Sequence, residues 1–557
     1  MPYRLDLTSS PLVGVVLLAA LLAGCGGVAG TLDEAGELFA EGGERVLREP
    51  MRLVRGTDRV LVIALDGVGE AVLTDALAAG DMPRLAAFLG ADRGGGVRDH
   101  AYVAGGVPAV FPSETAAGWA AVYTGTPPAE SGVTGNEWFD RDSLATFAPV
   151  PLSVGTLEQT LAIWSDTLFS AVIQTPTLFE RADLRSHVSL GFVYRGADLL
   201  TPPDLNDVGD LLEAAVEAAV GGADEAYEEI DDDTREGVER GADRYGLPDL
   251  QVAYFPGVDL VAHASGSDAQ RAYLRDEIDV HIGEILDLYR ERGALATTSV
   301  VVVSDHGHTA ALADDRHSLD MGGADEPPAL LDSLGYRLRD FDVGADTSDA
   351  NVVMIYDEAV AMLYLANGAT CPNEGDVCDW TARPRLFEDV LPLARELRDA
   401  GASMDTSAVG GLAGALDLVL VRASDPSGRT SPPYRVLHRG RLVPIGEYVR
   451  ESGRDDLVAF EERVGWLTDG LLGHRAGDIL LLAKSGEHRP IEDRFYFGSP
   501  RRSGHGGASA SDSYISLVLA REGASGADLR ETMRAAIGDA PTQLDVTPLV
   551  LSLLGAE

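Results

Sequence analysis

Ser113 and Thr115 lie two residues apart, directly after a proline, in the segment VFPSETAAGWAAVYTG at residues 110–125. The run TAAGWAAVY is typical of a short helix, and a Ser or Thr before a helix is commonly a cap for its first N–H groups. The alternative is that one hydroxyl is a nucleophile, at a helix N-terminus that would also favour an approaching anion. The segment by itself leaves both interpretations open.

Carboxylate and imidazole side chains recur beside apolar runs elsewhere in the chain. They are Asp66, Asp305 with His306, Asp259 with His263, and His505. Each one alone has an ordinary explanation as a helix cap, a surface pair or a turn residue. As a set, however, three aspartates and three histidines recur beside the apolar runs.

The surrounding pattern predicts how these side chains are positioned. We expect strands at 59–65, 249–255, 299–304 and 514–520, and helices at 70–80 and 270–292. This alternation predicts an α/β domain with a mostly parallel sheet. Ligands of such folds bind beyond the carboxyl ends of the strands, so the aspartates and histidines are expected at one edge. The acidic run at 223–233 is interpreted as a solvated face.

Composition narrows the classes of function. The chain has 557 residues, 45% of them hydrophobic, and a formal net charge of −45. That charge argues against binding a nucleic-acid duplex, which requires a basic surface. A phosphate-bearing ligand would instead need a local positive centre.

The first residues predict export. Arg4 precedes an apolar run at 11–22, which is shorter than the roughly 20 residues that span a bilayer. The run ends in Leu-Ala-Gly-Cys, which resembles a bacterial lipoprotein signal with Cys25 as the lipidated residue. We therefore expect a signal peptide at 1–24, a tether at 25–55, a folded part from 56 and a lipid anchor in the cell envelope. The alternative is a plain signal peptide with an incidental cysteine.

Two further cysteines, Cys371 and Cys378, close the short loop CPNEGDVC. In an exported protein they are expected to form a disulfide bond, although two unpaired thiols are the alternative.

Taken together, the motifs resemble the alkaline phosphatase superfamily. They are Asp66, FPSET, YTG followed by PP and GN, D-x-x-x-H at 259–263, SDHG at 304–307, GHG at 504–506 and DVTPLVLSLLG at 545–555. Their order is most similar to the type I phosphodiesterase/nucleotide pyrophosphatase branch. The resemblance covers 57–310 and 500–557, and we expect 320–495 to be an insertion that partly caps the site.

The resemblance implies a three-layer α/β sandwich and two zinc ions, although other divalent metals are possible. One ion would be held by Asp66, Asp305 and His306, and the other by Asp259, His263 and His505. Thr115, itself a ligand, would be the nucleophile that forms a phosphothreonine intermediate, and Asn136 would bind a phosphoryl oxygen. Two ions about 4 Å apart stabilise both the attacking and the leaving oxygen of an in-line displacement.

Several alternatives stay open at this point. The substrate is expected to be a small phosphate ester, with a nucleotide or a lipid head group among the possibilities. A monoesterase would need an extra positive group, for which Arg501 and Arg502 are candidates. His308, where the family commonly has an apolar residue, is either an extra polar contact or an exposed side chain. A lipid-anchored binding protein without turnover is the alternative from another class.

Overall fold

The computed structural model describes residues 44–149, 172–202, 224–320, 326–339, 349–373, 375–403, 411–422 and 432–556. The predicted signal peptide, Cys25 and most of the predicted tether lie outside these residues. Among the helices of the described ranges, none is both long and apolar enough to cross a membrane.

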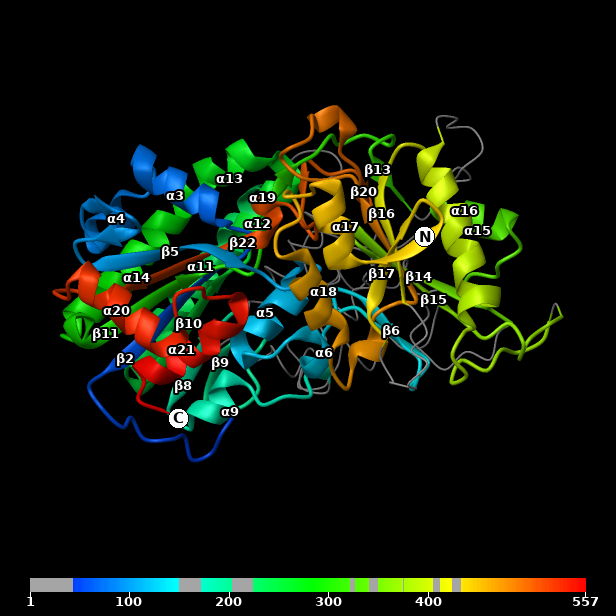
Figure 1. Ribbon diagram of the computed structural model, residues 1–557. Coiled ribbons are helices and arrows are strands. Elements are labelled where there is room, and N and C mark those ends of the chain that lie inside the picture. Colours follow the sequence, from blue (N-terminus) through cyan, green and yellow to red (C-terminus); the bar gives the residue numbers. More distant parts are fainter. Residues whose placement is uncertain are drawn as a thin grey trace, which may run out of the picture.

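A ten-stranded sheet forms the centre of the larger half of the molecule (Figure 1). Its order is β1 (Arg45–Val46), β9 (Leu199–Thr201), β8 (Ser186–Ser189), β10 (Leu250–Phe255), β2 (Arg59–Leu65), β11 (Thr298–Val303), β22 (Tyr514–Ala520), β5 (Ala101–Pro108), β4 (Val97–Arg98) and β3 (Asp92–Gly94). The block from β9 to β11 is parallel, whereas β22 pairs antiparallel with both β11 and β5. The predicted mostly parallel sheet is confirmed.

Both faces of this sheet are covered. Along β2 the side chains alternate between two hydrophobic clusters, with Val60 and Val62 in one and Leu61 and Ile63 in the other. The first cluster includes residues of α5 (Thr115–Thr124), α9 (Leu178–Ala182), α20 (Gly526–Ile537) and α21 (Val546–Leu553). The second includes residues of α3 (Glu70–Ala79), α4 (Pro83–Leu89), α12 (Gly257–Ser265) and α14 (Asp279–Glu291). The alternation explains why continuous apolar runs form strands buried on both sides.

Two expectations need correction in detail. Residues 44–55 were assigned to the tether, but β1 pairs with β9 and Arg52 bonds to Asp198, so the described fold begins before Gly56. The acidic run belongs to α11 (Asp224–Tyr245), and it is not entirely a solvated face. Asp231 is fully buried there, and its carboxylate accepts a hydrogen bond from the Gly257 N–H at the start of α12.

The region between β11 and β22 contains a second sheet. Its antiparallel order is β14 (Val352–Asp357), β15 (Val360–Leu365), β19 (Ile479–Ala483), β16 (Leu416–Arg422), β17 (Tyr434–His438) and β18 (Arg441–Pro444). Residues of α16 (Leu391–Ala402) pack on one face, and residues of α17 (Ile445–Ser452) and α18 (Phe460–Thr468) on the other. The α17/α18 face also buries Phe111 and Phe139 of the larger half, so the two halves share a hydrophobic core.

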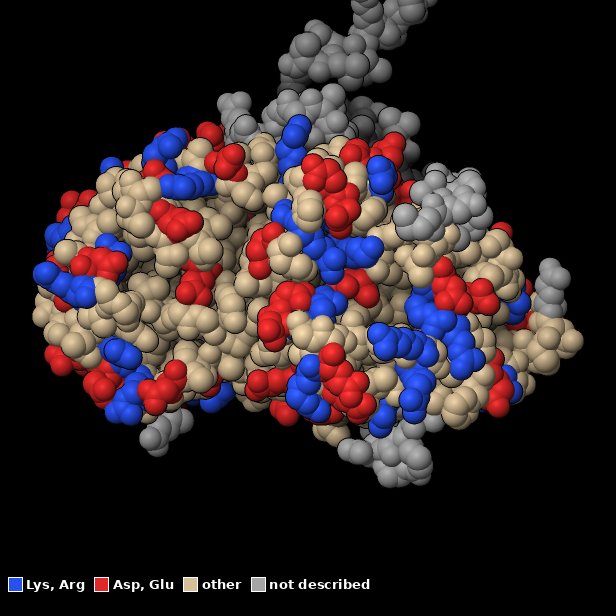
Figure 2. Space-filling model, turned by 45° about the horizontal axis from the view of Figure 1, so that its top comes forward, with Lys and Arg blue, Asp and Glu red and all other residues tan. Residues whose placement is uncertain are grey.

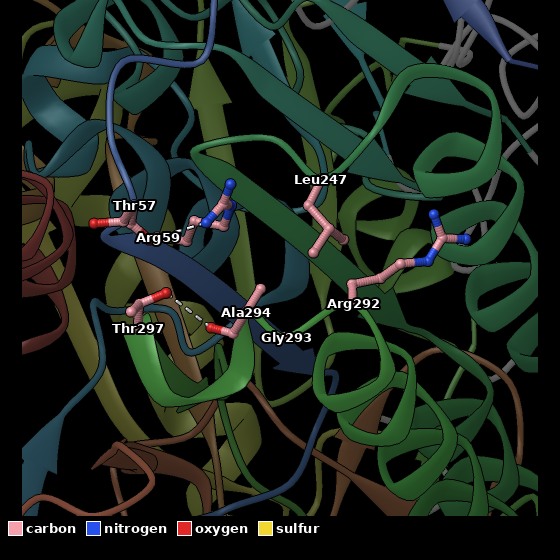
Figure 3. A pocket seen from close by; sticks show the side chains of 7 residues that line it. All are labelled: Thr57, Arg59, Leu247, Arg292, Gly293, Ala294 and Thr297. Carbon is pink, nitrogen blue, oxygen red and sulfur yellow. Dashed lines mark hydrogen bonds between the residues drawn. The ribbon is translucent and has the colours of Figure 1, made fainter.

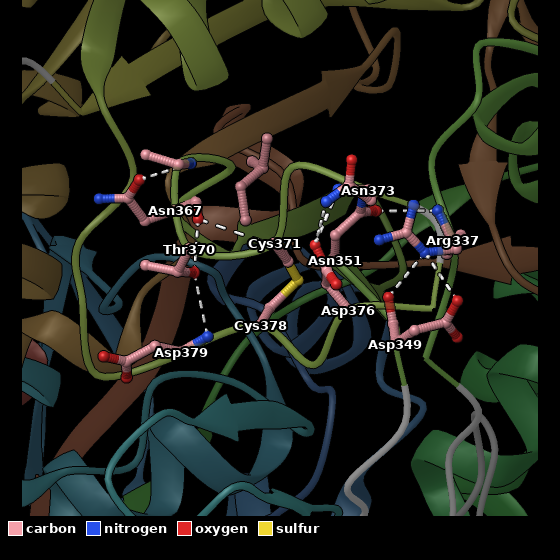
Figure 4. The surroundings of a disulfide bond; sticks show 12 residues. Arg337, Asp349, Asn351, Asn367, Thr370, Cys371, Asn373, Asp376, Cys378 and Asp379 are labelled. Atoms are coloured by element: carbon pink, nitrogen blue, oxygen red, sulfur yellow. Dashed lines mark hydrogen bonds and ion pairs between the residues drawn. A yellow bond between two sulfur atoms is a disulfide. The ribbon is translucent and has the colours of Figure 1, made fainter.

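Cys371 and Cys378 are joined by a disulfide bond, with their Cα atoms 4.8 Å apart (Figure 4). The surrounding loop is further held by side-chain bonds such as the one from the Asp379 N–H to Thr370 Oγ1 at 3.1 Å. On the face in Figure 2, acidic and basic side chains are interspersed, despite the large net negative charge.

Candidate metal centre

The parallel register brings three aspartates to one edge of the main sheet. Leu65 at the end of β2 pairs with Phe255 of β10, and Ala64 pairs with Val303 of β11. Asp66, Asp259 and Asp305 follow these strand ends and are all buried. The predicted convergence at the carboxyl edge therefore follows from the register.

The first set of donor atoms gathers around His306. Its Nε2 atom lies 3.5 Å from Asp66 Oδ1 and 3.3 Å from Asp305 Oδ2. Thr115 Oγ1 lies 3.1 Å from the same nitrogen. Within the described part of the chain, Asp66 Oδ1 and Asp305 Oδ2 have no hydrogen-bond partner although both are buried. Four potential ligand atoms thus surround one point.

Neighbouring groups fix the orientation of these side chains. The second oxygen of Asp66 accepts hydrogen bonds from Trp119 Nε1 at 3.1 Å and from the Tyr254 hydroxyl. Asp305 Oδ1 accepts from the N–H of Gly67 at 3.1 Å. His306 Nδ1 lies 3.2 Å from the Gly307 carbonyl, which can only accept, so the proton is on Nδ1 and the Nε2 lone pair is left for a metal.

The electrostatics of this set favour binding of a cation. Burial, followed by the charge of Asp259, raises the pKa of Asp66 to about 7. Burial, followed by the charge of Asp66, raises the pKa of Asp305 well above its usual value. Burial, followed by the charge of His505, lowers the pKa of His306. Buried carboxylates that repel one another beside a neutral imidazole are the environment that a divalent ion would stabilise.

Helix α5 presents Thr115 to this set. Thr115 is its first residue and is 6% exposed, and the whole helix is buried. Gly118 lets the helix approach, because a Cβ atom there would lie only 2.8 Å from Asp305 Cβ. Ser113 is turned away from the set and lies 3.2 Å from the Gly507 carbonyl, to which it donates. Of the two candidate nucleophiles, only Thr115 contacts a predicted ligand through its hydroxyl.

Asn136 is tied to the start of the same helix. Its Oδ1 atom accepts a hydrogen bond from the Ala116 N–H and its Nδ2 atom donates to Glu114 Oε2, each at 2.8 Å. Burial raises the pKa of Glu114 to about 7. Glu114 is therefore a positioning residue for Asn136 that the sequence analysis did not identify.

The second set of donor atoms adjoins the first. Asp259 Oδ2 lies 3.3 Å from His263 Nε2, one helical turn away on α12. The His505 ring stacks on that of His306, with 3.8 Å between the centroids. Ligand atoms of Asp259, His306 and His505 all lie within 4.8 Å of one another. All six residues predicted to hold metal are thus brought together.

Two residues beside this set were not among the predicted ligands. His308 Nε2 lies 2.6 Å from Asp259 Oδ1, so this buried histidine makes a polar contact and is not exposed. Glu358, on the β14–β15 hairpin, lies 3.5 Å from His505 Nε2 through Oε1. In the sequence, the repetition of His at 306 and 308 around a glycine could have indicated that His308 belongs to the site. An acidic residue in a hairpin turn gave no such indication for Glu358.

Arg501 and Arg502 were candidates for an extra positive group. Arg501 forms an ion pair with Glu358 Oε1, so a carboxylate already neutralises its charge. Arg502 is exposed. The structure therefore assigns neither guanidinium to an uncompensated phosphate site.

The pocket in Figure 3 lies elsewhere. It has a volume of about 390 Å³ and is lined by residues such as Arg59, Arg292 and Thr297. Arg59 begins β2, and Thr297 precedes β11, so the pocket is at the amino ends of these strands, opposite the aspartates. Its lining has no carboxylate or imidazole, and we place the candidate site at the carboxyl edge.

A comparison with protein families supports this choice. Residues 60–323 match the family model described as type I phosphodiesterase / nucleotide pyrophosphatase. Over these residues the chain is similar to this family. The match spans Asp66, Thr115, Asn136, Asp259, His263, Asp305 and His306. The resemblance to the alkaline phosphatase superfamily and its three-layer α/β fold is confirmed.

Curated proteins match this chain over shorter segments. An uncharacterized pyrophosphatase/phosphodiesterase of Schizosaccharomyces pombe is 36% identical over 70 residues, which are 12% of this chain and 14% of that protein. Ectonucleotide pyrophosphatase/phosphodiesterase 2 of Saccharomyces cerevisiae is 25% identical over 213 residues, 37% of this chain and 39% of that protein. The matched segments thus span less than half the length of these relatives.

Two solved structures align with this chain over most of its length. Murine ectonucleotide pyrophosphatase/phosphodiesterase 5 has a TM-score of 0.49 and 14% identity, and the alignment covers 90% of this chain and 95% of that chain. Phosphonoacetate hydrolase from Sinorhizobium meliloti, in complex with phosphonoformate, has a TM-score of 0.46 and 15% identity, with 91% and 98% covered.

Proposed function

We propose that this protein is a metal-dependent phosphoric ester hydrolase that cleaves a phosphodiester or a nucleotide pyrophosphate. One observation carries the proposal: Thr115 Oγ1 lies 3.1 Å from His306 Nε2, beside two buried carboxylate oxygens that lack hydrogen-bond partners in the described residues. A hydroxyl at a helix N-terminus among carboxylate and imidazole donors is the arrangement for an activated nucleophile. The family match supports the same class of reaction.

The residues present fit two divalent ions, most readily zinc. Asp66, Asp305, His306 and Thr115 would hold one ion, and Asp259, His263 and His505 the other. When bound, the ions would lower the pKa of the Thr115 hydroxyl and neutralise charge on the phosphoryl oxygens. Carboxylate and imidazole donors without thiolate suit zinc.

The chain's own groups would then carry the reaction. Thr115 Oγ1 attacks phosphorus, a P–O bond forms, and the bond to the leaving oxygen breaks, giving a phosphothreonine and an alcohol or a phosphate product. Water then cleaves the phosphothreonine and restores the hydroxyl. Asn136, held by Glu114 and the Ala116 N–H, retains one Nδ2 proton to donate to a phosphoryl oxygen.

A diester is favoured over a monoester. A monoester carries an additional negative charge, which requires an additional positive group. Arg501 is paired with Glu358 and Arg502 is exposed, so neither supplies one in this arrangement. A nucleotide or a lipid head group fits this class of substrate equally well.

The test is zinc content measured together with hydrolysis of a nitrophenyl phosphodiester and of nitrophenyl phosphate. We expect two ions per chain and faster cleavage of the diester. Bound zinc with neither ester cleaved, over a panel of leaving groups, would favour a binding protein without turnover. Faster cleavage of the monoester would favour an alkaline phosphatase-like activity.

We also propose that the mature protein is exported and anchored through lipid on Cys25, which would bring the site to an envelope surface. The support is the Leu-Ala-Gly-Cys motif in the sequence. Metabolic labelling with a radioactive fatty acid should mark the wild-type protein and not Cys25→Ser. Equal labelling of both would contradict the anchor.

A further inference from the structure

Glu358 occupies an unusual place for an acidic side chain. It is the first residue of the two-residue turn between β14 and β15, at a hairpin tip where a charged side chain would ordinarily reach solvent. Glu358 is instead only 5% exposed. Its backbone has φ of 48°, in the left-handed region that glycine and asparagine prefer in such turns. The turn thus directs a carboxylate inward from the second sheet.

The carboxylate faces two predicted ligands of the second ion. Glu358 Oε1 lies 3.6 Å from His263 Nε2 and 3.5 Å from His505 Nε2. Ligand atoms of these three residues all lie within 4.8 Å of one another. They belong to α12, the β14–β15 hairpin and the loop before β22, which are far apart in the sequence.

The hydrogen bonds of both histidines indicate which ring nitrogen carries the proton. His263 Nδ1 lies 2.9 Å from the Ser503 carbonyl, and His505 Nδ1 lies 3.2 Å from the Ser113 carbonyl. Carbonyl oxygens only accept, so each Nδ1 carries a proton, and in a neutral imidazole the Nε2 atom then presents a lone pair. Two Nε2 atoms and a carboxylate oxygen therefore face one another, and the two nitrogens can present their lone pairs to a cation between them.

We propose that Glu358 is a further ligand of the second ion, beside Asp259, His263 and His505. This inference rests on the proposed two-ion centre. The other oxygen of Glu358, Oε2, accepts a hydrogen bond from the backbone N–H of His505 at 2.8 Å, and Arg501 pairs with Oε1. The carboxylate is therefore held in place from two sides. The second sheet thereby contributes directly to metal binding.

A competing role for Glu358 is that it serves only as the counter-ion of the half-buried Arg501. The two roles differ in what each substitution does. Removing a ligand weakens metal binding, whereas removing Arg501 leaves the carboxylate free to bind. A pure counter-ion role predicts that neither substitution changes zinc affinity at the second ion.

The experiment measures Zn²⁺ affinity of the purified full chain by competition with a chromophoric chelator. Glu358→Gln should weaken one of the two zinc sites by about 10-fold or more, which is the scale for disturbed metal shells. Arg501→Met should keep or increase zinc affinity. Glu447→Gln, at an exposed glutamate on α17 of the same region, is the matched control and should leave both sites unchanged. Unchanged affinity of both sites in Glu358→Gln would overturn the proposal.

Two safeguards keep the outcome interpretable. If Glu358→Gln does not fold by circular dichroism, Glu358→Asp retains the charge for Arg501 but withdraws the oxygen, and the same loss of zinc affinity is expected. Full affinity in that variant would also overturn the proposal. Because zinc binding is read without substrate, a wild-type chain that binds two ions but hydrolyses no ester would contradict the proposed function and leave this inference standing.

Discussion

Arg463 Nη2 donates a hydrogen bond to Ser113 Oγ at 2.6 Å, although the two residues are 350 positions apart in the sequence. Arg463 lies on α18 of the second half and is fully buried. The same guanidinium donates to the carbonyls of Ala109 at 2.7 Å and Val110 at 3.0 Å. An arginine from the inserted region therefore holds the loop that precedes Thr115.

The first prediction concerns this arginine. Arg463→Met should lower the free energy of unfolding by about 3 kcal/mol or more, because several buried acceptors lose their donor. It should also lower kcat while the zinc content is retained, since the loop before Thr115 loses its support. Urea unfolding, zinc analysis and diesterase assays measure these effects. Arg450→Met, at an exposed position on α17, is the control, and an equal effect of both substitutions would contradict the role of Arg463.

The second prediction separates the two hydroxyls. Thr115→Ala removes the proposed nucleophile but none of the six carboxylate and imidazole ligands, so both ions should still bind while turnover falls by several orders of magnitude. Ser113→Ala should cost about 1 kcal/mol of stability through its lost hydrogen bonds and keep most activity. Activity and zinc content are measured on both variants. If Ser113→Ala abolished turnover while Thr115→Ala did not, the nucleophile would be Ser113. If neither mattered, a covalent mechanism through these hydroxyls would be wrong.

The third prediction uses the buried Asp231. Burial raises its pKa to about 8, with smaller opposing effects from the Gly257 N–H and the Tyr273 hydroxyl. Because the folded-state pKa lies above the unfolded one, the stability that this group contributes is present below about pH 4. It is lost as the pH rises towards 8, at up to about 1.4 kcal/mol per pH unit.

Asp231→Asn should therefore stabilise the protein at pH 8 and have little effect at pH 4.5. The neutral amide fits, since the Tyr273 hydroxyl can accept from it while donating to the Tyr227 carbonyl at 2.7 Å. Urea unfolding of both proteins at the two pH values tests this. The exposed Asp268→Asn is the control. A variant that is equally destabilised at both pH values would show that Asp231 acts as a charged cap of α12.

The fourth prediction concerns removal of metal. Without cations, the buried carboxylates of Asp66, Asp259 and Asp305 raise one another's energy, so chelation should lower the Tm and zinc should restore it. A ligand present at 100 times its Kd stabilises the folded state by about 2.7 kcal/mol per site. Differential scanning calorimetry across a zinc titration measures the effect. A Tm that is independent of zinc would contradict a metal centre at these residues.

The sequence predicted those site residues that come directly after a predicted strand. Asp66 and Asp305 each follow a continuous apolar run, and parallel pairing of the runs determines that both carboxylates reach the same edge. The predicted strand at 59–65 agrees with β2, and the predicted helical run from Thr115 agrees with α5. At these residues the local sequence pattern and the overall fold favour the same secondary structure.

Other contributors could not be predicted because their local pattern indicates a different environment. Glu358 lies between two apolar strands, where an acidic residue ordinarily marks an exposed turn. Arg463 lies in EERVGW, where an arginine among charged neighbours indicates an outer helix face. Both become buried only through packing between the two halves, which depends on contacts between distant parts of the chain. The antiparallel direction of β22 was likewise not encoded in its apolar run.

The position of β22 has a consequence for incomplete chains. This strand comes from the C-terminal part of the sequence, yet it lies between β11 and β5 in the middle of the main sheet. Until it has emerged from the ribosome, the apolar strand β11 and the strand β5 have unpaired backbone groups on facing edges, which are templates for association with other chains. A premature stop codon shortly before Tyr514 would therefore produce insoluble aggregates rather than a shorter soluble protein.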